Sequence, residues 1–100
     1  MSSLEQFMDT EEWGSPVEVE RRNRIKLSIA AYAYEFENTS IISDSDFDDL
    51  AKTINIQLST GNSRMDKFFR EHFSEFTGQW IHKHPEKNKL KAIYLKYYRK

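Results

Sequence analysis

Cysteine is absent from this chain of 100 residues. Disulfide bonds, thiolate nucleophiles and thiolate ligands for metals are therefore excluded, and the chain is compatible with a reducing cytoplasm. Glycine and proline are scarce, with three and two residues, while 38% of the residues are hydrophobic and 31% are charged. This balance favours a folded helical protein that faces water over a disordered or β-rich one.

Long apolar runs and a basic N-terminal segment are also missing. A membrane-spanning helix needs roughly 20 mostly apolar residues, and no stretch of the sequence approaches that length. Residues 1–13 contain Glu5, Asp9, Glu11 and Glu12 but no Lys or Arg, which is the opposite of a secretion signal. We therefore expect no membrane partner and a cytoplasmic location, which would be the host cytoplasm if the chain is viral.

The net charge of −1 conceals a division between the two halves of the chain. Residues 1–50 contain twelve acidic and four basic residues, whereas residues 51–100 contain four acidic and eleven basic ones. Such a division could steer a charged partner or let the two halves attract each other on folding. We favour attraction between the halves, because it requires no partner.

Residues 16–56 have the pattern of a helical hairpin. Ser15 is a helix cap followed by Pro16 and Glu18, and Ser43 is a second cap followed by acidic residues. The short connection between the two helices favours antiparallel packing. Apolar residues at helical spacing predict the buried stripes, which are Ile25, Ile29, Tyr32 and Phe36 in the first helix and Phe47, Leu50, Ala51 and Ile54 in the second.

Further helices are predicted in the basic region 63–99, after a break at residues 59–63. Their stripes are Met65, Phe68, Phe69, His72 and Phe73 in one helix, and Leu90, Ile93, Tyr94 and Tyr97 in another that Pro85 opens. Residues 79–84 could add one turn with Trp80 and Ile81 pointing inward. The predicted fold is all-α, an N-terminal antiparallel helical hairpin plus two or three further helices. One domain would cover residues 15–100, after a loosely ordered segment at residues 1–14.

The three histidines are candidate metal ligands. His82 and His84 would share a face only on an extended segment, and His72 could be a third ligand. Because no strand is predicted there, ordinary surface histidines explain the pattern better than a zinc site does. We expect no metal.

Basic and aromatic residues alternate in the C-terminal region, a pattern that could track a phosphate backbone and stack on bases. The candidate contacts are Lys87, Lys89, Lys91, Lys96 and Arg99. The alternative is an amphipathic helix with a solvated lysine face. We favour that alternative, because a pI near 6.3 is far from the basic values typical of nucleic-acid binders.

Residues 33–50 read AYEFENTSIISDSDFDDL. A Tyr-rich helix, a short turn ending Ile-Ser-Asp and a second helix with an aromatic-Asp-x-Leu start resemble the N-terminal helical hairpin of bacterial NAD-dependent DNA ligases. The similarity extends over roughly residues 25–54, which is under half of the chain. In that family the hairpin closes over the nicotinamide mononucleotide half of NAD.

The resemblance implies a ligand site. Tyr34 corresponds to the tyrosine that stacks on the nicotinamide ring, Asp44 and Asp48 to the two functional carboxylates, and Phe47 to a tyrosine of the family. An aromatic face can stack on the ring, and carboxylates favour its positive charge. Asp44 and Asp48 are one helical turn apart and project from the same face. NAD or NMN is the implied ligand, and no cofactor is expected to be required.

Two positions depart from the family. Glu35 stands where the family has a histidine and adds a negative charge that would disfavour a pyrophosphate, and Phe47 lacks the tyrosine hydroxyl. The ligases also carry their adenylated lysine in a Lys-x-Asp-Gly motif on a separate domain, whereas none of the glycines here follows an Asp. We therefore expect no enzymatic activity.

These observations predict a non-catalytic binding module related to the ligase hairpin, acting through a nucleotide or a protein partner. Its stand-alone form suggests a small accessory protein of the sort that phage genomes encode. One alternative is a protein-interaction or structural module that has lost the ligand. The other is a weak nucleic-acid binder that uses the basic C-terminal half.

Overall fold

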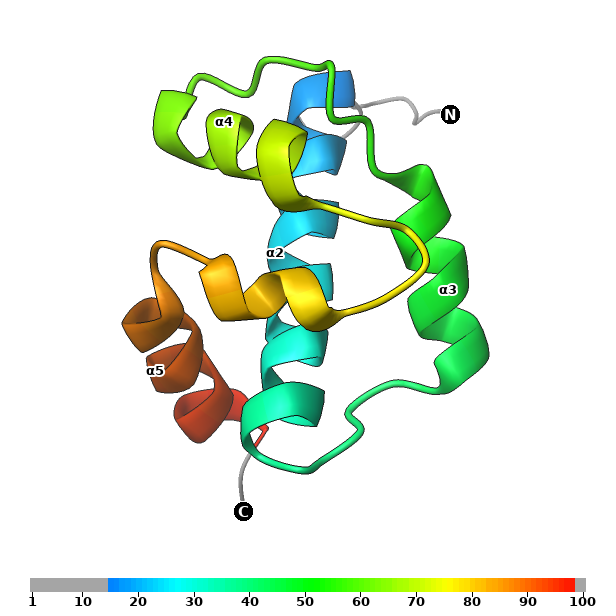
Figure 1. Cartoon of the computed structure of the whole chain (residues 1–100), viewed down its shortest axis with the longest axis vertical. Helices are drawn as coiled ribbons and strands as arrows, with labels where there is room; N and C mark the ends of the chain where they lie inside the picture. The colour runs from blue at the N-terminus through cyan, green and yellow to red at the C-terminus, as the bar shows by residue number, and fades with distance from the viewer. Residues whose placement is uncertain (1–14, 99–100) are drawn as a thin grey trace, which may run out of the picture.

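The computed structural model describes residues 15–98, and every regular element within that range is helical. The elements are α2 (Pro16–Phe36), α3 (Asp44–Thr53), α4 (Ser63–His72), the short 3-10 helix η1 (Gln79–Lys83) and α5 (Lys87–Tyr97) (Figure 1). The all-α prediction is confirmed. The expectation for residues 1–14 and the predicted contact at Arg99 lie outside the described residues.

Side-chain caps define where three of the helices begin. The Ser15 hydroxyl accepts a hydrogen bond from the Glu18 amide at 3.2 Å, and the Ser43 hydroxyl accepts one from the Asp46 amide at 3.0 Å. Both caps were predicted, and each contributes about 1 kcal/mol. Asn62 caps α4 in the same way, through the Met65 amide at 3.1 Å. Pro85 does not open α5 as predicted, because that helix begins at Lys87.

Helices α2 and α3 form the predicted antiparallel hairpin, with α3 running back alongside α2 (Figure 1). The chain reverses just after α2 at Asn38, whose φ of 55° lies in the left-handed region. Asparagine tolerates that region better than most residues. The Ala33 carbonyl accepts hydrogen bonds from the Glu37 and Thr39 amides, both at 3.0 Å, and so closes the end of the helix.

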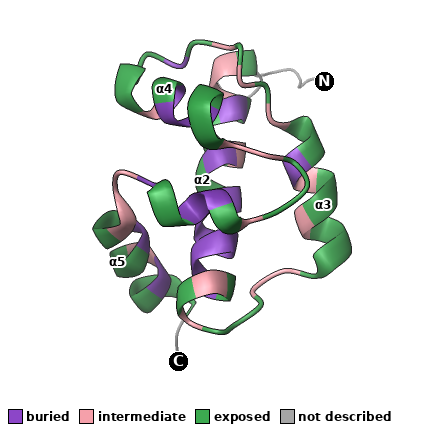
Figure 2. Cartoon of the chain, viewed as in Figure 1, coloured by how far each residue is buried: buried purple, intermediate pink, exposed green. Residues whose placement is uncertain are grey.

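Helix α2 is the central element of the fold and contacts α3, η1 and α5. Residues 27–33 are therefore buried on every face, as Figure 2 shows along the middle of the helix. Ile29 and Tyr32 are buried as predicted, but the prediction was wrong for Ile25 and Phe36, which are 52% and 42% exposed. A single apolar stripe suits a helix that packs against one neighbour, whereas this helix packs against three.

A second part of the core is aromatic and joins α4 to η1. Phe69 and Trp80 have ring centroids 5.5 Å apart, and Phe73 lies 5.3 Å from the same indole. Trp80 and Ile81 are buried, as predicted for this turn. The apolar stripes predicted for α4 and α5 are shorter than expected. His72 is exposed, and Tyr97, in the last turn of α5, is 68% exposed.

A buried ionic network ties α2 to α4 and to the segment between α3 and α4. Arg24 is 4% exposed and donates to Glu20 and Asp66, each at 2.7 Å. The Asp66 carboxylate also accepts from the Thr60 amide at 3.0 Å and from its hydroxyl at 2.7 Å. The buried Arg24–Asp66 pair joins the two halves of the chain. Its signs are the reverse of those expected, because the base comes from the acidic half and the acid from the basic half.

His84 is also part of the interior, which corrects its prediction as a surface residue. Its side chain is 4% exposed and lies edge-on to the Phe68 ring, with centroids 5.1 Å apart. The Glu86 amide donates to His84 Nδ1 at 2.9 Å, so that nitrogen carries no proton. Burial lowers the pKa of His84 to about 4; the Glu86 carboxylate opposes this shift, and Lys87 and Arg64 lower the pKa further.

The Arg24 network predicts a large loss of stability on removal of one carboxylate. Asp66→Ala should cost about 3–5 kcal/mol in free energy of unfolding, because it leaves a buried guanidinium with one of its two carboxylate partners missing. Urea denaturation followed by circular dichroism measures the change. Asp49→Ala is the matched control at an exposed position and should change stability by less than about 0.5 kcal/mol. An equally small change for Asp66→Ala would contradict the assigned role.

Asp66 should also contribute to acid sensitivity. Burial alone raises the pKa of its carboxyl, but hydrogen bonds from Thr60 and Arg24 outweigh burial and hold the pKa below its ordinary 3.8. The stabilisation is therefore complete above that value and is lost as pH falls through the lower folded pKa. Asp66→Ala should accordingly lose less stability than the unsubstituted chain when the pH is lowered from 5 to 3.

The burial of His84 predicts a loss of stability at mildly acidic pH. Between pH 6.5, its ordinary pKa, and about 4, the unfolded chain binds a proton that the folded chain does not, so stability falls as pH falls through that window. His84→Asn keeps an acceptor near the Glu86 amide and should flatten the dependence. Urea midpoints at several pH values test this. Titration of the His84 ring near pH 6.5 in the folded chain, observed by NMR, would contradict it.

Candidate functional site

The four residues singled out by the ligase resemblance line one cleft. Tyr34, Asp44, Phe47 and Asp48 all border a space of about 350 Å³ between α2, α3 and residues 76–79. The hairpin explains this convergence, because antiparallel packing brings the last turns of α2 beside the first turns of α3. Asp44 and Asp48 lie one turn apart at the start of α3, and Tyr34 lies near the end of α2.

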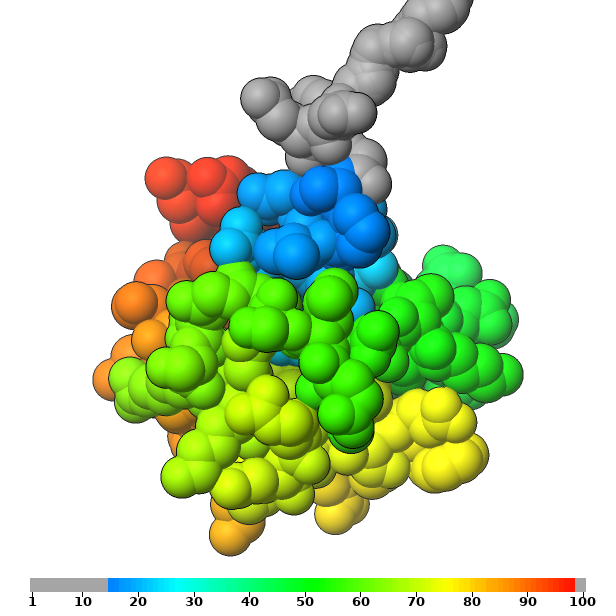
Figure 3. Space-filling model, turned by 90° about the horizontal axis from the view of Figure 1, so that it is seen from above, coloured from blue at the N-terminus to red at the C-terminus, as the bar shows by residue number. Residues whose placement is uncertain are grey.

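Residues 76–79 form a wall of the cleft that the sequence did not reveal. The segment lies beside α3 in both Figure 1 and Figure 3. A methyl group placed at Gly78 would lie 3.4 Å from Phe47 Cζ, which shows how closely this segment approaches the second helix. Phe76, 88% exposed, also borders the cleft. In the sequence, the only indication of this wall was an aromatic residue, Phe76, directly before the Thr77-Gly78 break.

The cleft is acidic and partly aromatic. Its described lining includes the carboxylates of Glu35, Asp44 and Asp48 and no Lys or Arg. Glu35 is held by His82, whose Nε2 lies 2.9 Å from Glu35 Oε1. The His82 ring in turn packs against Phe36, with centroids 4.8 Å apart. Glu35 is thus fixed at the side of the cleft by an exposed imidazole.

These surroundings suit a flat, positively charged ligand. The side chain of Tyr34 is 61% exposed, so its ring face is available for stacking. An aromatic face attracts a cation through its quadrupole, and desolvation in a cleft strengthens that attraction. The carboxylates of Glu35, Asp44 and Asp48 strengthen the attraction for a cation. They would repel a phosphate group placed inside the cleft.

The lysines proposed for nucleic-acid binding do not share one surface of α5. Successive residues turn by about 100° in an α-helix, so Lys87 and Lys91 lie on one side and Lys89 and Lys96 on the opposite side. Lys87 donates to the His82 and His84 carbonyls at 3.0 and 3.1 Å, and Lys89 lies 3.5 Å from a Glu86 oxygen. The lysines in the described part of α5 therefore lie on two opposite sides of the helix and do not form one positively charged surface.

The histidines do not come together as a metal site. His84 is buried, whereas His72 and His82 are exposed on α4 and η1. Over residues 15–98 no group of three His, Asp or Glu side chains has a spacing that could hold a metal ion.

Among residues 15–98, no helix combines the length and apolar character required to cross a bilayer.

Comparison with known proteins returns no relative. No protein-family model, no curated protein and no solved structure matches this chain.

Proposed function

We propose that this chain is a non-catalytic binding module whose cleft takes the nicotinamide ring of NMN, or the same ring of NAD. The observation that carries the proposal is the convergence of Tyr34, Asp44, Phe47 and Asp48 on one cleft. All four residues belong to the segment that resembles the ligase hairpin.

The chemistry of the cleft supports the oxidised ring as the recognised group. Oxidised nicotinamide attached to ribose is flat, aromatic and cationic, and it fits a tyrosine face next to the carboxylates of Asp44 and Asp48. The ring amide can donate to those carboxylates. Glu35 also borders the cleft and repels phosphate. The mononucleotide, with its phosphate directed to solvent, therefore fits better than the dinucleotide.

The absence of a nucleotidyltransferase motif supports a non-catalytic role. Adenylate transfer in the ligases requires a lysine in a Lys-x-Asp-Gly motif, and Gly14, Gly61 and Gly78 follow Trp, Thr and Thr. The chain would therefore present or sequester the ligand rather than transform it.

An NMR titration with NMN tests the proposal. Amide shifts should cluster at Tyr34, Asp44 and Phe47, and Asp48→Asn should weaken binding by at least about tenfold, which corresponds to about 1.4 kcal/mol. Asp49→Asn is the matched control, because Asp49 lies on the same helix and borders a different surface hollow. Reduced NMN, whose ring is neutral, should bind more weakly than oxidised NMN if the carboxylates recognise the cation.

Two results would overturn the proposal. If millimolar NMN causes no amide shift changes, a protein-interaction module is the better-supported function. Oligonucleotide binding that weakens steeply with salt and maps to Lys87, Lys89, Lys91 and Lys96 would instead support nucleic-acid binding.

A further inference from the structure

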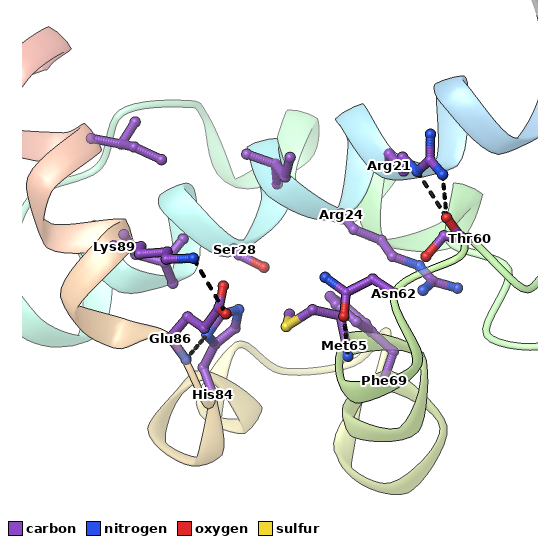
Figure 4. Close-up of a pocket in the computed structure, with 13 residues that line it drawn as sticks. Arg21, Arg24, Ser28, Thr60, Asn62, Met65, Phe69, His84, Glu86 and Lys89 are labelled. Atoms are coloured by element: carbon purple, nitrogen blue, oxygen red, sulfur yellow. Dashed lines mark hydrogen bonds and ion pairs between the residues drawn. The ribbon is translucent and has the colours of Figure 1, made fainter.

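A second hollow lies on another face of the molecule and is almost entirely apolar. It has a volume of about 280 Å³ and is lined by side chains of α2, α4 and α5, including Ile25, Met65, Phe69, Leu90 and Ile93 (Figure 4). We call it the α2–α4–α5 groove. It shares no lining residue with the acidic cleft. Ile25 and Tyr34 are nine residues apart and so lie on opposite sides of α2.

The groove exposes apolar surface that the described residues leave uncovered. Ile25 is 52% exposed although it borders this hollow and belongs to the central helix. Met65 and Ile93 are only half-buried. An isolated exposed isoleucine needs no explanation, but here an exposed isoleucine and two half-buried apolar residues line one concave site that can accommodate apolar side chains.

The charged side chains at the rim of the groove are paired with one another or with neighbouring residues. Arg21 and Lys89 stand at its two ends (Figure 4), and their side chains are 45% and 75% exposed. Arg21 is held in place by hydrogen bonds to the Thr60 carbonyl and by the Glu18 carboxylate, 3.3 Å from its Nη1. The buried charge of Arg24 is neutralised by Glu20 and Asp66 and does not add to the rim. Glu86 is the acid that borders the groove, and it pairs with Lys89 at 3.5 Å.

We propose that the occupant of the α2–α4–α5 groove is residues 1–14 of the same chain, a contact independent of the function proposed for the cleft. This segment contains the apolar residues Leu4, Phe7, Met8 and Trp13, the acidic residues Glu5, Asp9, Glu11 and Glu12, and no base. Its apolar side chains are therefore suited to the apolar lining of the groove. Leu4, Phe7 and Met8 have the spacing that places three side chains on one side of a helical turn.

The segment is long enough and starts in the right place. It joins α2 at Ser15, and Ile25 lies about 15 Å along the helix from that point. Fourteen residues can span up to about 45 Å when extended, so the apolar residues can reach the groove after the chain reverses.

Covalent linkage favours this occupant over a separate molecule. A short linker gives the tethered segment an effective concentration of the order of millimolar. A second copy of the chain or another protein would have to exceed that concentration or bind more tightly. An external protein that uses the groove would therefore act by displacing residues 1–14.

The lack of cysteine allows a direct test in the full-length chain. Ser3→Cys provides one thiol for a nitroxide spin label next to Leu4. The label should broaden the methyl signals of Ile25 and Ile93 beyond detection and leave those of Ile42, which borders the acidic cleft, unchanged. Adding Phe7→Ser should restore the Ile25 and Ile93 signals, whereas the matched control Gln6→Ser should leave them broadened. Neither substitution alters a residue of the described core.

Other outcomes would overturn the proposal. Absence of broadening at Ile25 and Ile93, or equal broadening at Ile42, would show that residues 1–14 do not occupy the groove. Broadening of isotope-labelled chains by spin-labelled chains in a mixture would assign the groove to a second copy. Loss of the Tyr34 and Asp48 response to NMN would leave this result unaffected, so failures of the two proposals are distinguishable.

Discussion

The guanidinium of Arg24 is buried, and the arrangement of the surrounding chain depends on satisfying it. Glu20 and Asp66 supply the charges, and the Asn55 and Leu58 carbonyls accept at 2.8 and 3.2 Å. A buried charge without such partners would cost several kcal/mol. Helix α4 and residues 55–60 are thereby held against α2. The guanidinium also lies 4.9 Å from the centre of the Phe69 ring, which connects the network to the aromatic core.

The position of α2 at the centre of the fold explains why two separate surfaces surround it. Alanines at positions 30, 31 and 33 are buried in the middle of the helix and let its neighbours approach closely. Towards its end, α2 meets the start of α3 and borders the acidic cleft. Around Ile25, on the opposite side, it borders the apolar groove. One surface is suited to a cationic aromatic ligand and the other to apolar side chains, because the helix presents different residue types on its two sides.

The candidate site was only partly predictable from sequence. Tyr34, Asp44 and Asp48 could be grouped because they lie on both sides of a short turn, where hairpin geometry places them together. The third wall could not be found, because Phe76 and Gly78 are distant in sequence from the hairpin, and Gly78 lies next to Phe47 through the packing of η1 against α2. The anchoring of Glu35 by His82 was hidden for the same reason, since the two residues come from elements far apart along the chain.

The sequence by itself determined the helical class, the two serine caps and the hairpin, because these features depend on local spacing and local hydrogen bonds. Only the tertiary structure decided which faces are buried. The predicted stripe of α2 assumed one neighbour, whereas contact with three neighbours buries residues 27–33 and leaves Ile25 exposed. It also buries His84 and makes it neutral. Burial depends on what packs against a residue, and that information lies in distant segments of the chain.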